Sequence, residues 1–207
     1  MRTELGAKVA VWLGLAAGIC VPYFGLQRIG GRGLHGVPAT FLDRWIDFEP
    51  GWIGIYLSIC VLVPLAPALA TTRDSLLRYA KGLALLCTIC FAAFWLVPIA
   101  GPRPVEVVDH TLYQWVVQVD RPSNSMPSLH AGLAAYSLLF IDRTLREDRL
   151  ARPRILAGAI GGVWAALIFY STLATKQHWA LDLPAGVLAA WVAQRWAWRD
   201  SDSLSGR

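Results

Sequence analysis

Residues 82–100 read GLALLCTICFAAFWLVPIA, a run of 19 residues without one charged side chain. An α-helix needs about 20 mostly apolar residues to cross the hydrocarbon core of a bilayer. Three further stretches are charge-free over 19 to 21 residues, namely 9–27, 52–70 and 155–175. Four segments of spanning length in one short chain predict a polytopic membrane protein.

The composition points to the same class of protein. Of the 207 residues, 56% are apolar and 16% are charged, whereas a soluble domain usually carries about 25% charged residues. The mean hydropathy is +0.46, and a soluble domain of this length could not bury so much apolar surface in one core. These values exclude an ordinary soluble enzyme, a disordered chain and a disulfide scaffold.

Two shorter stretches, 128–141 and 183–194, are charge-free over 14 and 12 residues. Each reaches spanning length only if its helix begins among the polar residues just before it, as in helices that line a water-filled pocket. We therefore predict an all-α fold, a single membrane domain over residues 1–207 with six transmembrane helices. The predicted spans are 9–27, 52–70, 82–100, 128–141, 155–175 and 179–198.

The distribution of basic residues predicts the orientation of these spans. The segments on the side of the N-terminus hold 13 of the Lys and Arg residues, and the opposite loops hold 6. The positive-inside rule then places both termini in the cytoplasm, in an inner or plasma membrane. The first apolar run is of spanning length and more spans follow, so we expect an uncleaved helix rather than a signal peptide.

Three polar clusters fall at the outer ends of the predicted helices. In the first, Arg103 lies between two prolines that stiffen its backbone, and a guanidinium can bind phosphate through two hydrogen bonds. In the second, Ser128 suits the N-cap of a helix, whose free N–H groups bind phosphate, and His130 would lie in the first turn. An interfacial anchor and a plain helix start are the alternative interpretations.

The third cluster runs from residue 171 to residue 182. On a helix, His178 and Asp182 would share one face because they are four residues apart. A carboxylate in that place can hold the Nδ1–H of the imidazole and leave Nε2 free as a nucleophile or base. The alternative is an acid that stabilises a helix start. Taken together, the three clusters predict a phosphoryl-transfer site at the outer face.

Two of these motifs resemble a known family. The run Pro-Ser-Leu-His at 127–130 and the spacing Ser171…His178…Asp182 are similar to the second and third signatures of the type 2 phosphatidic acid phosphatase (PAP2) superfamily, P-S-G-H and S-R-x5-H-x3-D. The resemblance covers helices three to six, and it implies a PAP2-like helical bundle with its catalytic half at about 101–182. It also implies a metal-independent phosphatase or phosphotransferase without a cofactor.

The resemblance assigns a role to each matching residue. It implies that His178 attacks phosphorus and becomes phosphohistidine, and that Asp182 orients it. His130 would protonate the departing alkoxide and then activate the acceptor. Arg103, Ser128 and the backbone that follows would hold the phosphoryl oxygens.

The sequence also departs from the family pattern. Leu96 stands where the first signature, K-x6-R-P, has its lysine, and Thr172 stands where the third has its arginine. Leu129 replaces a glycine. Lys176 is a candidate to replace one missing phosphate-binding cation, and an interfacial lysine is the alternative. This variant resembles the branch that includes inositol phosphorylceramide synthases.

The expected partners are a phosphorylated lipid substrate and the membrane. Nucleic acid is not expected, because the basic run at 143–154 is mixed with acids and has no aromatic residue for stacking. Three functions stay open: hydrolysis of a lipid phosphate, transfer of a phospho-headgroup to an alcohol, and non-catalytic lipid binding or transport. The glycine-rich loop at 30–36 is interpreted as a flexible loop, with a substrate lid as the alternative, and the four cysteines as packing residues.

Overall fold

The computed structural model describes residues 5–29, 33–104, 108–148 and 150–199, and within these the protein is helical without a strand. The elements are α1 (Leu5–Ile29), α2 (Phe41–Trp45), a 3-10 turn (Pro50–Trp52), α3 (Ile53–Leu57), α4 (Ile59–Ala68), α5 (Arg73–Leu96), α6 (Thr111–Val119), α7 (Leu129–Glu147), α8 (Ala151–Ala174) and α9 (Asp182–Ala197). The all-α prediction is therefore confirmed.

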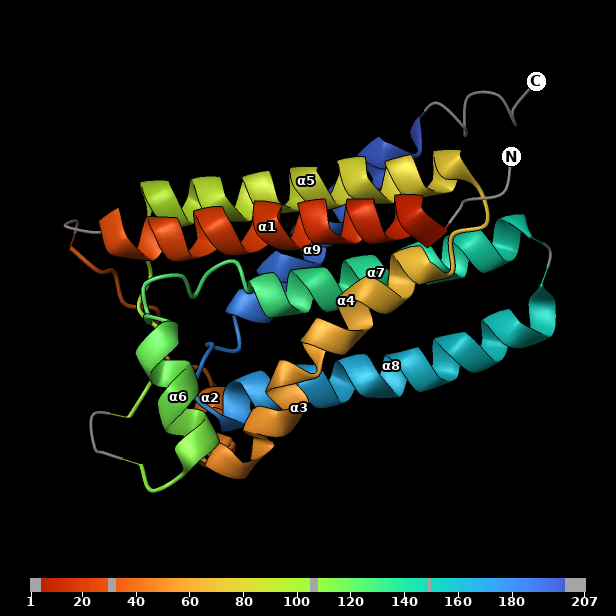
Figure 1. The fold of residues 1–207 in the computed structure, drawn as a ribbon. Helices are drawn as coiled ribbons and strands as arrows, with labels where there is room; N and C mark the ends of the chain where they lie inside the picture. Colours follow the sequence, from red (N-terminus) through yellow and green to blue (C-terminus); the bar gives the residue numbers. More distant parts are fainter. Residues whose placement is uncertain (1–4, 30–32, 105–107, 149, 200–207) are drawn as a thin grey trace.

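The long helices run back and forth as one bundle. Figure 1 shows α1 and α5 side by side, with α7 and α9 between this pair and α8. The loops after α1, α5 and α8 lie at one end, together with α2 and α6, whereas the start of α1 and the end of α9 lie at the other. The three polar clusters predicted from the sequence therefore share one end of the bundle.

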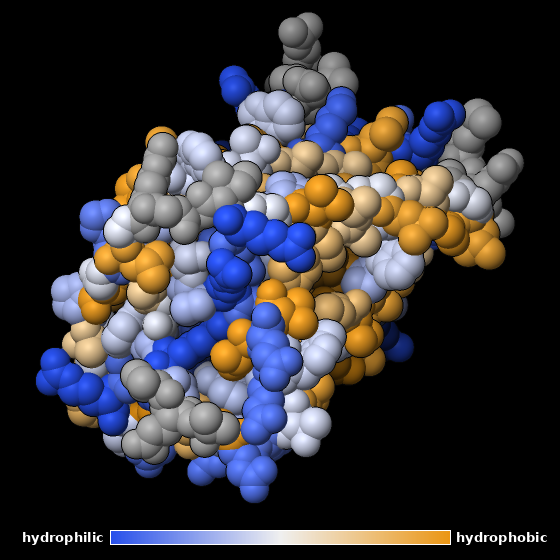
Figure 2. Space-filling view, turned by 60° about the vertical axis from the view of Figure 1, so that its left-hand side comes forward, coloured by the Kyte–Doolittle hydropathy of each residue, from blue (hydrophilic) through white to orange (hydrophobic). Residues whose placement is uncertain are grey.

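Four segments of the described chain are long and apolar enough to cross a membrane: Lys8–Arg28, Pro50–Ala68, Arg73–Leu96 and Ala151–Ala174. No residue of the spanning window of α1 is buried inside the protein, and hydrophobic residues cover the flank of the molecule while hydrophilic ones gather on the end that comes forward in Figure 2. An apolar flank of this extent indicates a membrane-embedded protein. Helices α7 and α9 do not meet the same criterion, so the six-span arrangement stays a prediction.

The helix boundaries differ from the predicted spans where local chemistry sets them. Helix α5 begins early, at Arg73, because Thr72 and Ser75 form a capping box. It ends at Leu96, and the chain is extended at Ile99, which pairs with Asn124. The second segment is broken between α3 and α4 at Ser58, whose hydroxyl accepts a hydrogen bond from the indole of Trp164 on α8 at 2.8 Å.

Helix α7 is the centre of the bundle and packs against α4, α5, α8 and α9. Its buried face includes Tyr136 and Phe140, which contact Tyr79 of α5. Helices α7 and α9 approach closely near their starts, because a Cβ atom on Gly186 would lie 2.2 Å from the carbonyl oxygen of Ser128. This contact fixes the start of α7 against the start of α9, where the candidate site lies.

The predicted packing role of the cysteines holds for Cys87 and Cys90, which are buried, but not for Cys20 and Cys60, which are exposed on the apolar flank. In the glycine-rich loop, residues 30–32 lie outside the described residues. His35, further along the loop, exchanges backbone hydrogen bonds with Pro98 and Ala100 at 3.0 Å each. This part of the loop is therefore tied to the segment that leads to Arg103.

Candidate active site

The three polar clusters are joined by direct contacts, some of the backbone and some of side chains. Gly101 donates a hydrogen bond from its N–H to the carbonyl of Pro122 at 2.8 Å, which joins the first cluster to the second. The indole of Trp179 donates to the carbonyl of Ala100 at 2.7 Å, which joins the third cluster to the first. The rings of His130 and His178 complete the triangle, with centroids 5.8 Å apart. Segments far apart in the sequence thus form one site.

His178 lies in the loop between α8 and α9, not on a helix as expected from its spacing. Its N–H donates to the carbonyl of Thr172 at 3.2 Å, and Lys176 turns the chain with a φ angle of 52°. The ring nitrogen Nδ1 lies 2.9 Å from the carbonyl oxygen of Ser125. A carbonyl oxygen only accepts hydrogen bonds, so Nδ1 carries the proton and Nε2 of the neutral ring keeps its lone pair.

Asp182 is fully buried as the first residue of α9. Its Oδ2 lies 3.4 Å from Nδ1 of His178, further than the Ser125 carbonyl. The same oxygen accepts hydrogen bonds from the hydroxyl of Ser125 and from the N–H of Trp179 at 2.8 Å. Asp182 and Ser125 therefore both orient the ring of His178. The only sequence signal for Ser125 was its place in the polar run at 123–125.

Ser128 is the N-cap residue of α7, as predicted. Its hydroxyl accepts a hydrogen bond from the N–H of Ala131 at 3.2 Å, and its own N–H donates to the carbonyl of Asp182 at 2.9 Å. The N–H groups of Leu129 and His130 lie between these two, in the turn where a helix offers no internal acceptor. They are the backbone donors that the start of α7 presents to an anion.

His130 lies in the first turn of α7, also as predicted. Its ring stacks on the ring of Tyr56 with centroids 4.0 Å apart and an interplanar angle of 25°. Tyr56 is buried at the end of α3. Sequence reasoning missed it, because an aromatic residue inside an apolar span carries no separate signal.

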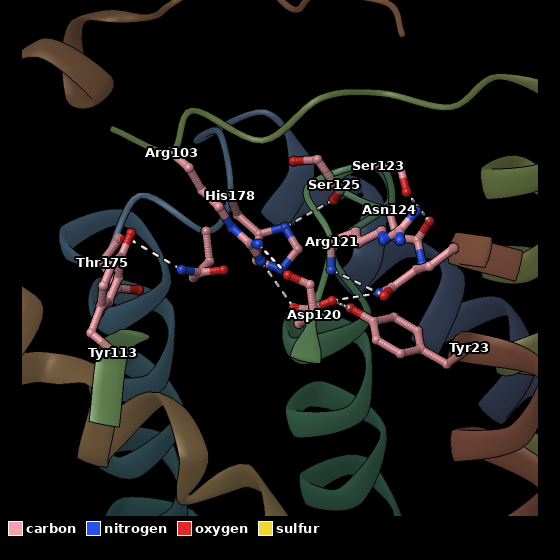
Figure 3. A network of polar contacts seen from close by, with 12 residues as sticks. Tyr23, Arg103, Tyr113, Asp120, Arg121, Ser123, Asn124, Ser125, Thr175 and His178 are labelled. Atoms are coloured by element: carbon pink, nitrogen blue, oxygen red, sulfur yellow. Dashed lines mark hydrogen bonds and ion pairs between the residues drawn. The ribbon is translucent and has the colours of Figure 1, made fainter. Parts of the chain in front are cut away.

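Arg103 forms a largely buried ion pair with Asp120. Its Nη2 lies 3.1 Å from Oδ2 of Asp120, with the two side chains 9% and 13% exposed, and its Nη1 donates to the Asp120 carbonyl. Asp120 also accepts hydrogen bonds from Tyr23 and Gln27 on α1. Figure 3 shows this network. The buried Nε of Arg103 has no hydrogen-bond partner among the described residues, so the guanidinium keeps at least this donor for a ligand.

The other basic candidate is engaged elsewhere. The ammonium group of Lys176 donates to the carbonyls of Asp43 at 2.9 Å and Ile46 at 2.5 Å, at the end of α2. Leu96, at the motif lysine position, is 68% exposed, and the hydroxyl of Thr172 donates to its own helix at Phe169. The ammonium group of Lys176 therefore uses two of its three donors on carbonyls of the α2 segment.

Contacts from the outer elements hold the loop that carries His178. Asp43 accepts a hydrogen bond from the N–H of Ala180 at 2.8 Å, and Glu49 donates from its N–H to the carbonyl of Ala174 at 2.8 Å. The hydroxyl of Tyr113 donates to the carbonyl of Thr175 at 3.2 Å. Burial raises the pKa of Tyr113, against the opposing charge of Arg103, so the phenol keeps the proton that it donates.

One of three comparisons with known proteins identifies a family. The family model described as PAP2 superfamily matches residues 51–196, which include all the candidate site residues. No curated protein and no solved structure matches the chain. The matched region covers well over half of the sequence, and the chain belongs to the PAP2 superfamily.

Proposed function

We propose that this protein is an integral membrane lipid phosphatase that hydrolyses a lipid phosphate through a phosphohistidine on His178. Membership of the superfamily supports a phosphatase or phosphotransferase that acts on lipid phosphates. The observation that carries the proposal is the contact that orients His178. Its Nδ1 lies 2.9 Å from the carbonyl oxygen of Ser125, which leaves Nε2 free to act as the nucleophile beside the second histidine.

In the first step, Nε2 of His178 attacks phosphorus and the bond from phosphorus to the lipid oxygen breaks. His130, whose ring centroid lies 5.8 Å from that of His178, acts as the general acid and gives a proton to the departing alkoxide. The phosphorylated imidazole keeps its proton on Nδ1 and gains positive charge. Asp182 stabilises this charge from 3.4 Å.

In the second step, neutral His130 takes a proton from water, and the resulting hydroxide attacks phosphorus. The bond to Nε2 breaks, phosphate leaves, and both histidines return to their starting states. The phosphoryl oxygens are held by the backbone N–H groups of Leu129 and His130, by the hydroxyl of Ser128 and by Nε of Arg103. Positioning and charge neutralisation of this kind supply most of the catalysis in phosphoryl transfer.

One observation favours a second candidate, a phosphotransferase that moves a phospho-headgroup from a diester lipid to an alcohol. The charge of Arg103 is balanced by Asp120 at 3.1 Å, and Lys176 binds carbonyl groups of α2 instead. A site with so little net positive charge suits a monoanionic diester better than a dianionic monoester. The departures at Leu96 and Thr172, and the resemblance to inositol phosphorylceramide synthases, support this candidate in the same way.

We further propose that the site faces the outside of an inner or plasma membrane, with both termini in the cytoplasm. The twofold excess of Lys and Arg on the opposite side supports this orientation. The lipid would then enter from the outer leaflet.

A competition experiment tests the proposal. Purified protein receives a lipid phosphate monoester together with a diester lipid and an alcohol acceptor, and the His178→Ala variant serves as the control. Release of inorganic phosphate from the monoester without a new diester supports the phosphatase. A new diester without free phosphate contradicts it and establishes the transferase, and no product from either lipid across phosphatidate, isoprenyl phosphates and phosphorylated sphingolipids favours a non-catalytic role.

A further inference from the structure

We propose that the seam between α1 and α5 binds an anionic phospholipid at a site separate from the catalytic centre. A cavity of about 210 Å³ lies at the outer ends of these two helices. Its polar lining consists of Gln27, Arg121, Ser123 and Asn124, and its apolar lining includes Phe94 and Trp95. None of these residues has a role in the chemistry proposed above.

The polar lining holds an unused donor. Asn124 is 7% exposed, and its Nδ2 has no hydrogen-bond partner in the described part of the chain, although its Oδ1 accepts from Ser123 at 3.2 Å. A buried amide without an acceptor costs about 1–3 kcal/mol, which a ligand oxygen can offset. Arg121 adds a positive charge to the same lining, and Figure 3 shows Arg121, Ser123 and Asn124 together. A cation beside a free amide donor suits an anionic group.

The same seam continues as an apolar groove of about 360 Å³. Pro22 and Phe91 line this groove, and Leu26 and Trp95, each four residues further on, line the polar cavity. The two hollows thus lie on the same faces of α1 and α5. Gly18 helps to form the groove, because nothing lies within 4 Å of a Cβ atom built on it.

This combination distinguishes a lipid from a free anion. An anion site at the outer end of two membrane helices, continued by an apolar groove along their seam, fits a phosphorylated headgroup with an acyl chain. Rim residues Leu34 and Trp95 are exposed apolar side chains, which suit the level of the membrane interface.

One short segment, residues 120–125, takes part in both sites. Gln27 accepts a hydrogen bond from the backbone N–H of Arg121 at 3.0 Å and donates to Asp120, the partner of Arg103. The carbonyl of Ser125, next to Asn124 in the chain, holds His178. Neither His178 nor Arg103 lines the polar cavity, so a lipid in it would adjoin the catalytic centre without using these side chains.

Lipid binding by the His178→Ala protein tests the proposal, since turnover is then absent. Native mass spectrometry in neutral detergent compares phosphatidylglycerol with phosphatidylcholine. We expect tighter binding of phosphatidylglycerol and a loss of about tenfold or more in Arg121→Gln, because a charge-assisted contact is removed. Arg44→Gln, which removes an exposed charge at the same end, is the matched control and should bind normally.

Two further variants decide what is bound and where. Gly18→Leu fills the groove and should weaken binding of phosphatidylglycerol, whereas Gly25→Leu, at another open position of α1, should not. If glycerol 3-phosphate displaces phosphatidylglycerol and the Gly18→Leu variant binds the lipid normally, the site binds a free anion. That result would overturn the proposal. Binding lost in Arg103→Gln but kept in Arg121→Gln would place the lipid in the catalytic centre and would also overturn it, with the proposed function left intact.

Discussion

Replacement of Asp182 by asparagine isolates the charge of this residue from its shape. Asparagine keeps an oxygen for the hydroxyl of Ser125 and the N–H of Trp179, and it removes only the negative charge. That charge lies 3.4 Å from Nδ1 of His178. At an effective dielectric constant of about 20, the attraction to a positive imidazole at this distance is about 5 kcal/mol.

Reorganisation of the neighbouring dipoles offsets part of this energy, so we expect a loss of about 3–4 kcal/mol in the transition state, or a rate lower by roughly 10²–10³. The same change in a Ser-His-Asp triad costs about 10⁴, because the wrong tautomer forms. Here the carbonyl of Ser125 fixes the tautomer of His178 from 2.9 Å, and the effect should be smaller.

The assay is release of phosphate from the preferred lipid of the panel, with the thermal unfolding of each variant measured alongside. Ser125→Ala is the matched control, because it keeps the carbonyl and removes one hydrogen bond to Asp182, and it should lose less than about tenfold. A rate for Asp182→Asn within threefold of the parent would refute the electrostatic role. A loss of about 10⁴ or more would refute the role of the Ser125 carbonyl in setting the tautomer.

Three other predictions concern the packing of α7 on α9, the role of Lys176 and the orientation in the membrane. Gly186→Ala should lower the unfolding temperature, at a cost of about 1–3 kcal/mol, because its Cβ would meet the backbone of Ser128 at 2.2 Å; an unchanged melting curve would contradict this packing. Lys176→Met should cost stability but change the KM for the lipid less than threefold, and a KM rise as large as that of Arg103→Gln would return Lys176 to the phosphate site. In a cysteine-free background, an impermeant thiol reagent should label Asp109→Cys from outside intact cells and Arg152→Cys only after the membrane is opened, and the reverse pattern would invert the topology.

The sequence was sufficient to predict the features that depend on one stretch of chain. Charge-free runs located the long helices, and Ser128 was correctly assigned to a helix start, because length, apolarity and N-cap chemistry are local properties. The spacing of His178 and Asp182 predicted that the two side chains lie together, and they are 3.4 Å apart, but the helix expected between them is a loop. Their closeness arises from a tight loop in which Trp179 and Asp182 exchange hydrogen bonds.

The residues that contact the site residues from distant parts of the chain could not be predicted from the sequence. Asp120 contacts Arg103, 17 residues away in the sequence, and Tyr23, 97 residues away. Lys176 binds carbonyl groups of the α2 segment that are 130 or more residues away in the sequence. The periodicity of apolar residues cannot predict such contacts, because they depend on how the loops at this end fold over the bundle. Tyr56 against His130 is a further example, because an aromatic residue in a span is typical of packing.

The central claim is that His178 carries the phosphoryl group, and a direct test is to trap it. The His130→Ala variant cannot protonate a lipid alkoxide, so the donor is an aryl phosphate labelled with ³²P, whose leaving group departs without a proton. After a quench in base, the variant should retain label that is stable to alkali and labile to acid, as expected of phosphohistidine. Peptide mapping should place the label on the segment that contains His178, and the double variant His130→Ala, His178→Ala should show none. Label on another residue, or turnover by His178→Ala above about a tenth of the parent rate, would contradict the account, because loss of the covalent route should cost many factors of ten.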